Sequence, residues 1–373
     1  MALSDRISNQ PAALIAVLTL ASTVAVTFAF QQLQKKTTTS KKMSQYLSKE
    51  AMIEAAGPPS LPDGFIVDSF TNSRSQSIFT INLPRADTSV PPKAMFVLVH
   101  GTAEYCCRKG YIRLYESLSK AGVDVYSMDS HGNGRSDGEP RGYTESIDDY
   151  VDEVVEYIQL VQKSKYAQDK CPPLVLMGHS LGGCIAVHSA LKMGSGKSDM
   201  SLILSSPALG VDMNLELKIQ KFFAPLIDFL APKARIVDAV DPIYLSRNKE
   251  AVQAYIDDPL CLVGKMVART AIATDKAFDT AKQRRGEIYC PTLMMHSPID
   301  KCTSQKASED FFVNVGTALA HKRYLKLNGM YHETLEEPET ERIINSIVKF
   351  TASGGQQFLE EDEGNDGIVE LFV

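Results

Sequence analysis

Short apolar runs alternate with helical patterns along most of the chain. Apolar runs of this kind, bounded by turn-forming residues, are typical of buried strands, and their alternation with helices favours a mostly parallel sheet with helices on its faces. The predicted fold class is therefore α/β. The eight predicted strands cover residues 65–70, 77–83, 94–100, 123–129, 174–177, 202–205, 292–296 and 323–327.

One helix is well defined by its pattern, between residues 146 and 164. Ser146 and Asp149 match a capping box, in which the two side chains satisfy free amides at the start of a helix. The apolar positions recur with the spacing of one helical face, which we expect to pack on the sheet. These positions are Ile147, Val151, Val154, Ile158 and Val161.

The alternation stops from residue 211 to residue 285, where helical patterns occur without a clear strand. We expect this segment to be a helical cap, inserted over the carboxyl edge of the sheet into an α/β domain formed by residues 46–210 and 286–352. Its segment 218–232, KIQKFFAPLIDFLAP, has two interpretations: ordinary core packing, or an apolar rim that contacts an acyl chain or a membrane. Residues 353–373 are predicted to be an acidic mobile tail.

Near the N-terminus, residues 12–30 carry no charge, and about 20 apolar residues suffice for a membrane-spanning helix. Residues 1–45 are therefore predicted to be a membrane anchor followed by a linker, with a cleaved signal peptide or an organelle-targeting leader as the alternatives. Basic residues gather after the run, which puts the rest of the chain on the cytoplasmic side, whereas cleavage would send it to a secretory or organellar compartment. These residues are Lys35, Lys36, Lys41 and Lys42, against Arg6 beside Asp5 before the run.

Composition excludes several function classes. The formal net charge of −6 provides no basic face for nucleic acid. Seven cysteines without metal-ligand spacing predict free thiols and no metal site. Residues 129–136, DSHGNGRS, lack both the ending of a phosphate-binding loop and the spacing of a dinucleotide fingerprint, so neither ATP nor NAD is expected. No cofactor is predicted.

The strongest chemical signal is the segment GHSLG, residues 178–182, between an apolar run and a helical pattern. This strand–turn–helix context is that of a nucleophile elbow, which presents Ser180 on a sharp turn. A serine hydroxyl needs a histidine to take its proton and a carboxylate to orient that histidine. Asp300 and His332 each follow a later predicted strand, in the chain order serine, acid, histidine.

Other acids and bases fit these positions less well. Asp310 falls inside a helical pattern, His296 ends a predicted strand, and His321 precedes the last strand instead of following it. For the oxyanion of the reaction intermediate, the fold offers the amide after the nucleophile and one after the third strand. Those are the backbone amides of Leu181 and Thr102.

With these motifs in place, the sequence resembles the monoacylglycerol lipase and lysophospholipase family of α/β-hydrolases, of the serine aminopeptidase S33 type. The resemblance runs from residue 97 to residue 350 and includes the cap segment 241–260, DPIYLSRNKEAVQAYIDDPL. It implies an α/β-hydrolase fold with an eight-stranded, mostly parallel sheet and an inserted cap. It also implies hydrolysis of acylglycerols or lysophospholipids without a cofactor, and plant relatives extend to esters of phenolic acids.

Carried over by residue, the resemblance supports the same triad and the same two amides. It further implies that Glu104, Arg108 and Tyr255 lie near the polar head of the substrate. Cys302 lies near the acid but is shifted relative to the family's cysteine, so the resemblance does not imply sensitivity to thiol reagents. The chain departs from the family where histidines are common, at Tyr105, Asn133 and Leu335.

The sequence thus predicts a serine hydrolase that cleaves the ester of a monoacylglycerol-like lipid through an acyl-enzyme. A lysophospholipase or an acyltransferase of the same fold is the first alternative. A membrane-tethered binding protein without catalysis is the second. The predicted partners are the lipid ester and a membrane, contacted through the N-terminal segment and through the cap.

Overall fold

A computed structural model describes residues 47–167, 170–196, 199–212, 224, 226–238, 241–358 and 368–372. The chain divides into two units, Met1–Met43 and Ser44–Val373, and all described elements belong to the second. The predicted anchor, residues 12–30, lies outside the described residues. Within the described ranges, no helix combines the length and the apolar character that crossing a bilayer requires.

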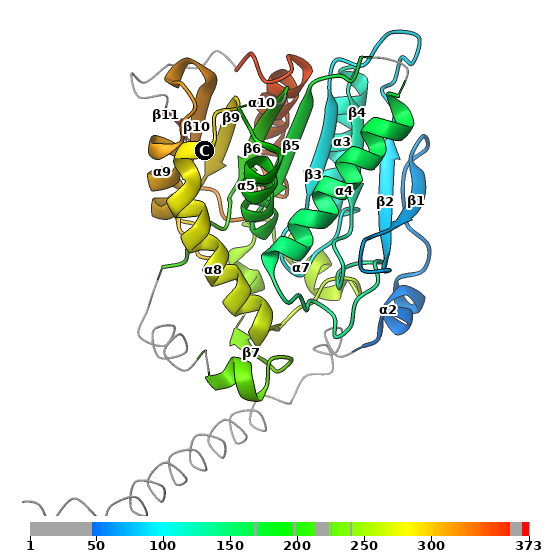
Figure 1. Ribbon diagram of the computed structural model, residues 1–373, viewed down its shortest axis with the longest axis vertical. Helices are drawn as coiled ribbons and strands as arrows, with labels where there is room; N and C mark the ends of the chain where they lie inside the picture. Colours follow the sequence, from blue (N-terminus) through cyan, green and yellow to red (C-terminus); the bar gives the residue numbers. More distant parts are fainter. Residues whose placement is uncertain are drawn as a thin grey trace, which may run out of the picture. The chain divides into compact units, whose positions relative to one another are not determined.

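The centre of the fold is one sheet in the order β1-β2-β4-β3-β5-β6-β9-β10-β11, and it contains all eight predicted strands (Figure 1). From β4 to β11 neighbouring strands are parallel, whereas β2 pairs antiparallel with both β1 and β4. The central strands are buried along their whole length, as parallel strands covered on both faces must be. The eight are β1 (Ile66–Thr71), β2 (Ser77–Leu83), β3 (Met95–Val99), β4 (Asp124–Met128), β5 (Leu174–His179), β6 (Met200–Ser205), β9 (Thr292–His296) and β10 (Lys322–Asn328).

The ninth strand, β11 (Ile368–Phe372), comes from the segment that the sequence predicted to be a mobile tail. It pairs in parallel with β10, from Tyr324 opposite Ile368 to Asn328 opposite Phe372. Its sequence IVELF is rich in residues that favour strands, and pairing it covers the edge that β10 would otherwise expose. The prediction of a mobile tail over residues 353–373 is therefore wrong at residues 368–372.

Helices cover both faces of the sheet (Figure 1). The predicted helix is confirmed as α4, and the Ser146–Asp149 capping box is formed. Alternate residues of β3 enter different cores, with Val97 and Val99 on one side and Phe96 and Leu98 on the other. One face carries α4 (Ile147–Lys165), α5 (Leu181–Met193) and α8 (Ala268–Arg284), and the other carries α3 (Lys109–Lys120) and α10 (Thr340–Ala352).

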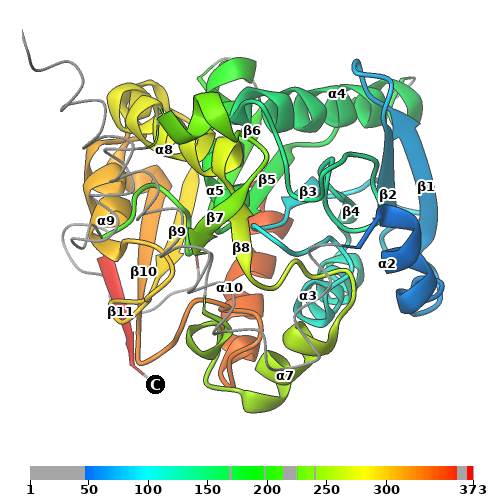
Figure 2. The same ribbon diagram turned by 90° about the horizontal axis from the view of Figure 1, so that it is seen from below.

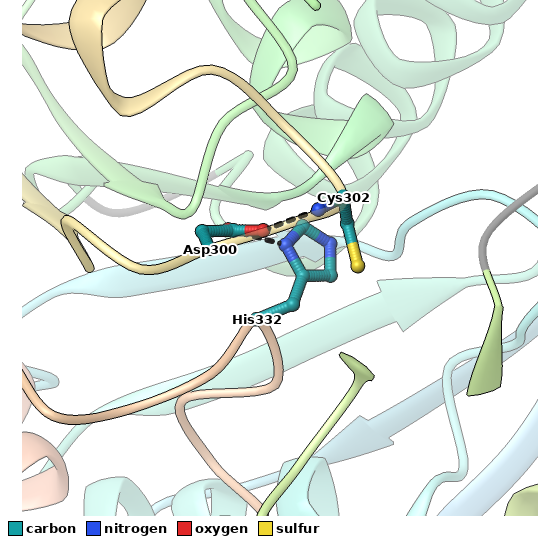
Figure 3. A group of neighbouring side chains, drawn as sticks. All are labelled: Asp300, Cys302 and His332. Carbon is teal, nitrogen blue, oxygen red and sulfur yellow. Dashed lines mark hydrogen bonds and ion pairs between the residues drawn. The ribbon is translucent and has the colours of Figure 1, made fainter. Parts of the chain in front are cut away.

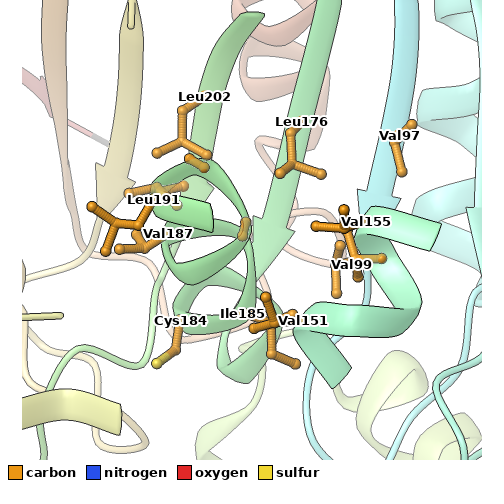
Figure 4. Packing of buried hydrophobic residues seen from close by; sticks show 14 of the residues in the cluster. Val97, Val99, Val151, Val155, Leu176, Cys184, Ile185, Val187, Leu191 and Leu202 are labelled. Carbon is orange, nitrogen blue, oxygen red and sulfur yellow. The ribbon is translucent and has the colours of Figure 1, made fainter. Parts of the chain in front are cut away.

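The core under α4 and α5 fixes the position of the strand ends where the site is built (Figure 4). Val151 and Val155 of α4 belong to the same buried cluster as Ile185 of α5 and Leu176 of β5. Because α5 begins directly after β5, this packing anchors the turn between them from both sides.

The segment predicted to be a helical cap contains more than helices. It holds η2 (Pro242–Tyr244) and α7 (Lys249–Asp257), and also a small antiparallel sheet of β7 (Arg235–Asp238) and β8 (Lys265–Val267), seen in Figure 2. The prediction of helices without an intervening strand is wrong for this pair, because strands so short leave no periodic pattern. Helix α8 packs on α5 and α4, so the end of the segment belongs to the helical layer of the sheet.

Helix α2 (Lys49–Ala56), which the sequence analysis did not predict, begins at the N-cap Ser48. Its Met52 is fully buried in a cluster with Ala103, Leu260 and Leu262. The helix thus packs on the loop after β3 and on the connection that follows α7. Both of these segments border the candidate site.

Candidate active site

Ser180 lies on a strained turn between β5 and α5, with φ 53° and ψ −122°. A Cβ at Gly178 would overlap the carbonyl oxygen of Gly182, and a Cβ at Gly182 would overlap that of Val99. Both glycines are therefore required by the close approach of the backbone. The Ser180 amide donates to the carbonyl oxygen of Ser205 at 3.0 Å and ties the turn to the end of β6.

Asp300 and His332 are brought together as predicted (Figure 3). Each follows the carboxyl end of its strand, β9 or β10, and His332 Nδ1 lies 2.7 Å from Asp300 Oδ2. The second carboxylate oxygen accepts from the amides of Cys302 at 2.7 Å and Thr303 at 3.2 Å. An imidazole that donates from Nδ1 keeps Nε2 as the acceptor for a serine proton.

The electrostatics of Asp300 keep it ionised. Burial alone would raise its pKa, but the charge of His332 and the hydrogen bonds from His296 and His332 hold that pKa well below its ordinary value. An ionised carboxylate stabilises the imidazolium that forms when His332 accepts a proton. The arrangement is therefore suited to general base catalysis.

His296, which the sequence analysis set aside as a base, contacts the acid instead. Its Nε2 lies 3.0 Å from Asp300 Oδ2, and its Nδ1 lies 2.8 Å from the Ser308 hydroxyl. Burial is the main cause that lowers the pKa of His296, so its imidazole is neutral and donates through Nε2. The spacing of four residues between a histidine at a strand end and the acid could have indicated this role from sequence.

The other two competitors lie elsewhere. Asp310 is on α9 (Gln305–Asn314), half-exposed, with the guanidinium of Arg285 at 3.6 Å. His321 ends η4 (Leu319–His321) and is exposed before β10 begins. The structure thus agrees with setting both aside.

The two candidate oxyanion donors, Thr102 and Leu181, border one pocket. Leu181 is the first residue of α5, where an amide has no partner within the helix. In the described part of the chain, no hydrogen bond uses the Thr102 amide. His100 is structural, because its Nε2 accepts from the Ser130 amide at 3.0 Å and its Nδ1 lies 2.7 Å from the Gly101 carbonyl oxygen.

The pocket has a volume of about 480 Å³ including its open mouth. It lies between the loop after β3, the 129–136 loop, α5 and the cap strand β8. Its apolar lining includes Ala103, Leu181, Ile185, Leu262, Met266 and Val267, and Asn133 is among its polar residues.

Glu104, Arg108 and Tyr255 are all buried, and none of them lines that pocket. Glu104 Oε1 accepts from the Gly101 amide at 2.5 Å and from the Tyr111 hydroxyl at 2.6 Å. The Arg108 guanidinium lies 4.9 Å from the centre of the Tyr255 ring. Burial would lower the pKa of Arg108, but nearby groups, with Cys261, Glu333 and Glu104 foremost, raise it.

A set of residues that was not predicted from the sequence joins the elbow to the histidine turn. His179 Nε2 lies 3.4 Å from Glu333 Oε1, and the His179 ring lies 5.0 Å from that of His332, centre to centre. The Ser206 hydroxyl donates to the His332 carbonyl oxygen at 2.9 Å. The signal in the sequence is position alone, since His179 precedes the nucleophile and Glu333 follows the histidine.

Two groups of side chains bring possible metal ligands within 4.8 Å of one another among the described residues: Asp300 with Cys302 and His332, and Glu104 with His179 and Glu333. In the first group, His332 Nδ1 lies 2.7 Å from Asp300 Oδ2, and a nitrogen that donates to a carboxylate has no lone pair left for a metal. In the second group, the positive charges of Arg108 and His179 already balance the carboxylates. We therefore assign a metal to neither group.

A serine on a strained strand-to-helix turn, with its partners on turns after later strands of a parallel sheet, defines a serine hydrolase of the α/β-hydrolase fold. Sequence comparison refines this class. The chain belongs to the family described as serine aminopeptidase, S33, whose sequence profile matches residues 90–339.

Individual relatives share less than a third of their residues with this chain. The phospholipase YtpA of Bacillus subtilis is 28% identical over 261 residues, which cover 70% of this chain and 95% of the relative. A monoacylglycerol lipase of Mycolicibacterium smegmatis is 27% identical over 262 residues, covering 70% and 89%. The crystal structure of Paleococcus ferrophilus monoacylglycerol lipase has 27% identity and a TM-score of 0.63, and the match covers 74% of this chain and 99% of that one.

Proposed function

We propose that the protein is a serine esterase that hydrolyses a monoacylglycerol-like lipid. The observation that carries the proposal is the 2.7 Å pair of Asp300 and His332 at the sheet edge where the elbow presents Ser180. Ser180 attacks the ester carbonyl, His332 takes its proton and passes it to the leaving alcohol, and Asp300 orients the imidazole. The Thr102 and Leu181 amides stabilise the oxyanion. Water then hydrolyses the acyl-enzyme, which releases the fatty acid and frees Ser180.

The proposed substrate class is supported by the relatives and by the pocket. Lipases and a phospholipase are among the relatives. The pocket beside Leu181, with its apolar lining, suits part of an acyl chain. Glu104, Arg108 and Tyr255 are buried outside this pocket, so a contact with the glycerol head is carried over from the family resemblance alone.

A lysophospholipase is the second candidate, favoured by the relative named as a phospholipase. A binding protein without catalysis is disfavoured by the backbone of Ser180, because a strained conformation persists only where the surrounding structure enforces it. Acyl transfer to an alcohol would use the same acyl-enzyme and would differ only in the final acceptor.

The membrane part of the proposal rests on two apolar features. Residues 12–30 are long enough for an anchor, with the catalytic unit on the cytoplasmic side. In the cap, Leu226, Phe229 and Leu230 are exposed, and Phe229 exposes 84% of its surface. Exposed apolar groups in the cap are suited to contact with a bilayer surface.

A fluorophosphonate probe, which labels activated serines, tests the proposal. We expect the wild-type protein to be labelled and to hydrolyse a monoacylglycerol, and Ser180→Ala and His332→Ala to do neither. Ser189→Ala is the matched control, because this buried serine lies in α5 and donates to the Ile185 carbonyl oxygen at 2.9 Å. A folded wild-type protein without labelling would contradict the proposal, and turnover of lysophospholipid alone would select the second candidate.

A further inference from the structure

We propose that His179 and Glu333 form a positioning pair that fixes the catalytic histidine turn against the nucleophile elbow. The inference rests on the proposed function, since it concerns how Ser180 and His332 are kept in register. Neither residue touches the reacting atoms in this proposal. Each acts through its neighbour in the chain.

The geometry that carries the proposal is one ion pair between two turns. His179 directly precedes Ser180, Glu333 directly follows His332, and His179 Nε2 lies 3.4 Å from Glu333 Oε1. Holding these two side chains together therefore limits the separation of the two catalytic residues. Both turns otherwise meet at the end of β6, where Ser205 Oγ lies 2.8 Å from Thr334 Oγ1 and 3.3 Å from His179 Nδ1.

Because both side chains are buried, each charge depends on its partner. Glu333 is 8% exposed and His179 2% exposed, so neither charge can be satisfied by water if its partner is removed. The Glu333 amide donates to the Leu245 carbonyl oxygen at 2.7 Å, which also ties the histidine turn to the cap. The pair thus lies where the elbow, the histidine turn and the cap meet.

Through its charge, Glu333 also affects the catalytic histidine, His332. The His179 and His332 rings are 5.0 Å apart, and a cationic His179 alone would oppose the imidazolium that forms on His332. Glu333 lies against His179 and balances its charge. The pair therefore positions the base without making it a weaker one.

A pH dependence follows from the groups that face His179. They are Glu104 from the loop after β3, Tyr111 from α3, His296 and Asp300 from the end of β9 and the turn after it, and His332 with Glu333 from the turn after β10. Burial would lower the pKa of His179, but the charges of Glu333, Glu104 and Asp300 raise it to about 9. Above that pH the ion pair is lost, and kcat should fall to a lower plateau.

The experiment measures kcat, KM and thermal stability of the full chain against pH, with a monoacylglycerol as substrate. Wild type should show an alkaline fall in kcat near pH 9. His179→Gln and Glu333→Gln should each lose on the order of 10- to 100-fold in kcat with KM within about twofold, because misplaced reacting groups slow chemistry more than binding. The double variant should lose little more than either single one, since both remove the same interaction.

His131→Gln is the matched control. His131 is also buried and also pairs with a glutamate, Glu153, at 2.8 Å. This variant should lose stability but keep the alkaline fall in kcat. The control therefore distinguishes the general effect of losing a buried pair from the specific effect of losing the His179–Glu333 pair.

The outcomes distinguish the two proposals. A wild-type protein without labelling or turnover would contradict the proposed function. An active wild type whose kcat shows no fall near pH 9 would overturn the positioning role even if the variants fail to fold. Folded variants with the kcat of wild type would overturn it as well.

Discussion

His296 donates to the same carboxylate oxygen of Asp300 that orients the candidate base, with its Nε2 at 3.0 Å. Two imidazoles therefore share Oδ2, one from the end of β9 and one from the turn after β10. Because His296 is neutral and buried, it fixes the carboxylate without adding a charge beside it.

Replacing His296 with phenylalanine should lower kcat about tenfold or more. Loss of a hydrogen-bond partner that orients a metal-binding side chain has an effect of this size, and His296 orients Asp300 in the same way. The Asp300 carboxylate would lose one donor and some of its fixed orientation. Kinetics of monoacylglycerol hydrolysis check this. His188→Phe is the control, since His188 is a buried histidine on α5 bonded to the Ala277 carbonyl oxygen at 3.0 Å, and equal kcat values for both variants would contradict a role for His296.

The free energy of unfolding should be highest between about pH 4.5 and 6.5. His179 gains a proton more readily when folded, so its contribution is complete below pH 6.5 and is lost as pH rises through about 9. Burial would raise the pKa of Glu333, but the charge of His179 lowers it to about 2, so its contribution is complete above pH 4.5 and is lost as pH falls towards 2. Denaturant titration at several pH values measures both limbs.

In Glu333→Gln both limbs should flatten, because the variant removes the partner that shifts His179 and the carboxylate that titrates. Parallel curves for the wild-type and variant proteins would show that other groups dominate the pH dependence.

Gly182→Ala should destabilise the fold by about 3 kcal/mol or abolish folding, because its methyl group would overlap the backbone of β3. Gly286→Ala is the control, since a Cβ there meets no atom within 4 Å. Urea unfolding of both variants measures the difference. Equal stabilities would mean that the elbow can shift away from β3.

Arg108→Met should cost about 3–5 kcal/mol of stability, because it leaves buried carboxylates without their cation. The loss concerns Glu104 and Glu333, which both interact with this guanidinium. Arg113→Met, on the helix that begins directly after Arg108 but 38% exposed in its side chain, should cost about 1 kcal/mol or less. Chemical denaturation separates the two, and a small loss for Arg108→Met would show that water enters the space it leaves.

The parts of the fold that the sequence predicted are those with strong local patterns. Buried parallel strands are continuous apolar runs, so β3, β5, β6 and β9 could be located, and strand ends then identified Asp300 and His332. The strands β7, β8 and β11 were missed because they are short or follow an acidic segment. The His179–Glu333 pair was not predictable, since it joins two residues that only the sheet order brings together.

The strand order has a consequence for synthesis of the protein. The elbow is complete once α5 exists, but the proposed acid and base, Asp300 and His332, follow β9 and β10, late in the chain. Chains are made from the N-terminus, and domains fold as units when their sequence is available. A ribosome that stops before residue 332 would therefore release a product without the proposed base, so the proposed ester hydrolysis would be confined to chains that extend past β10.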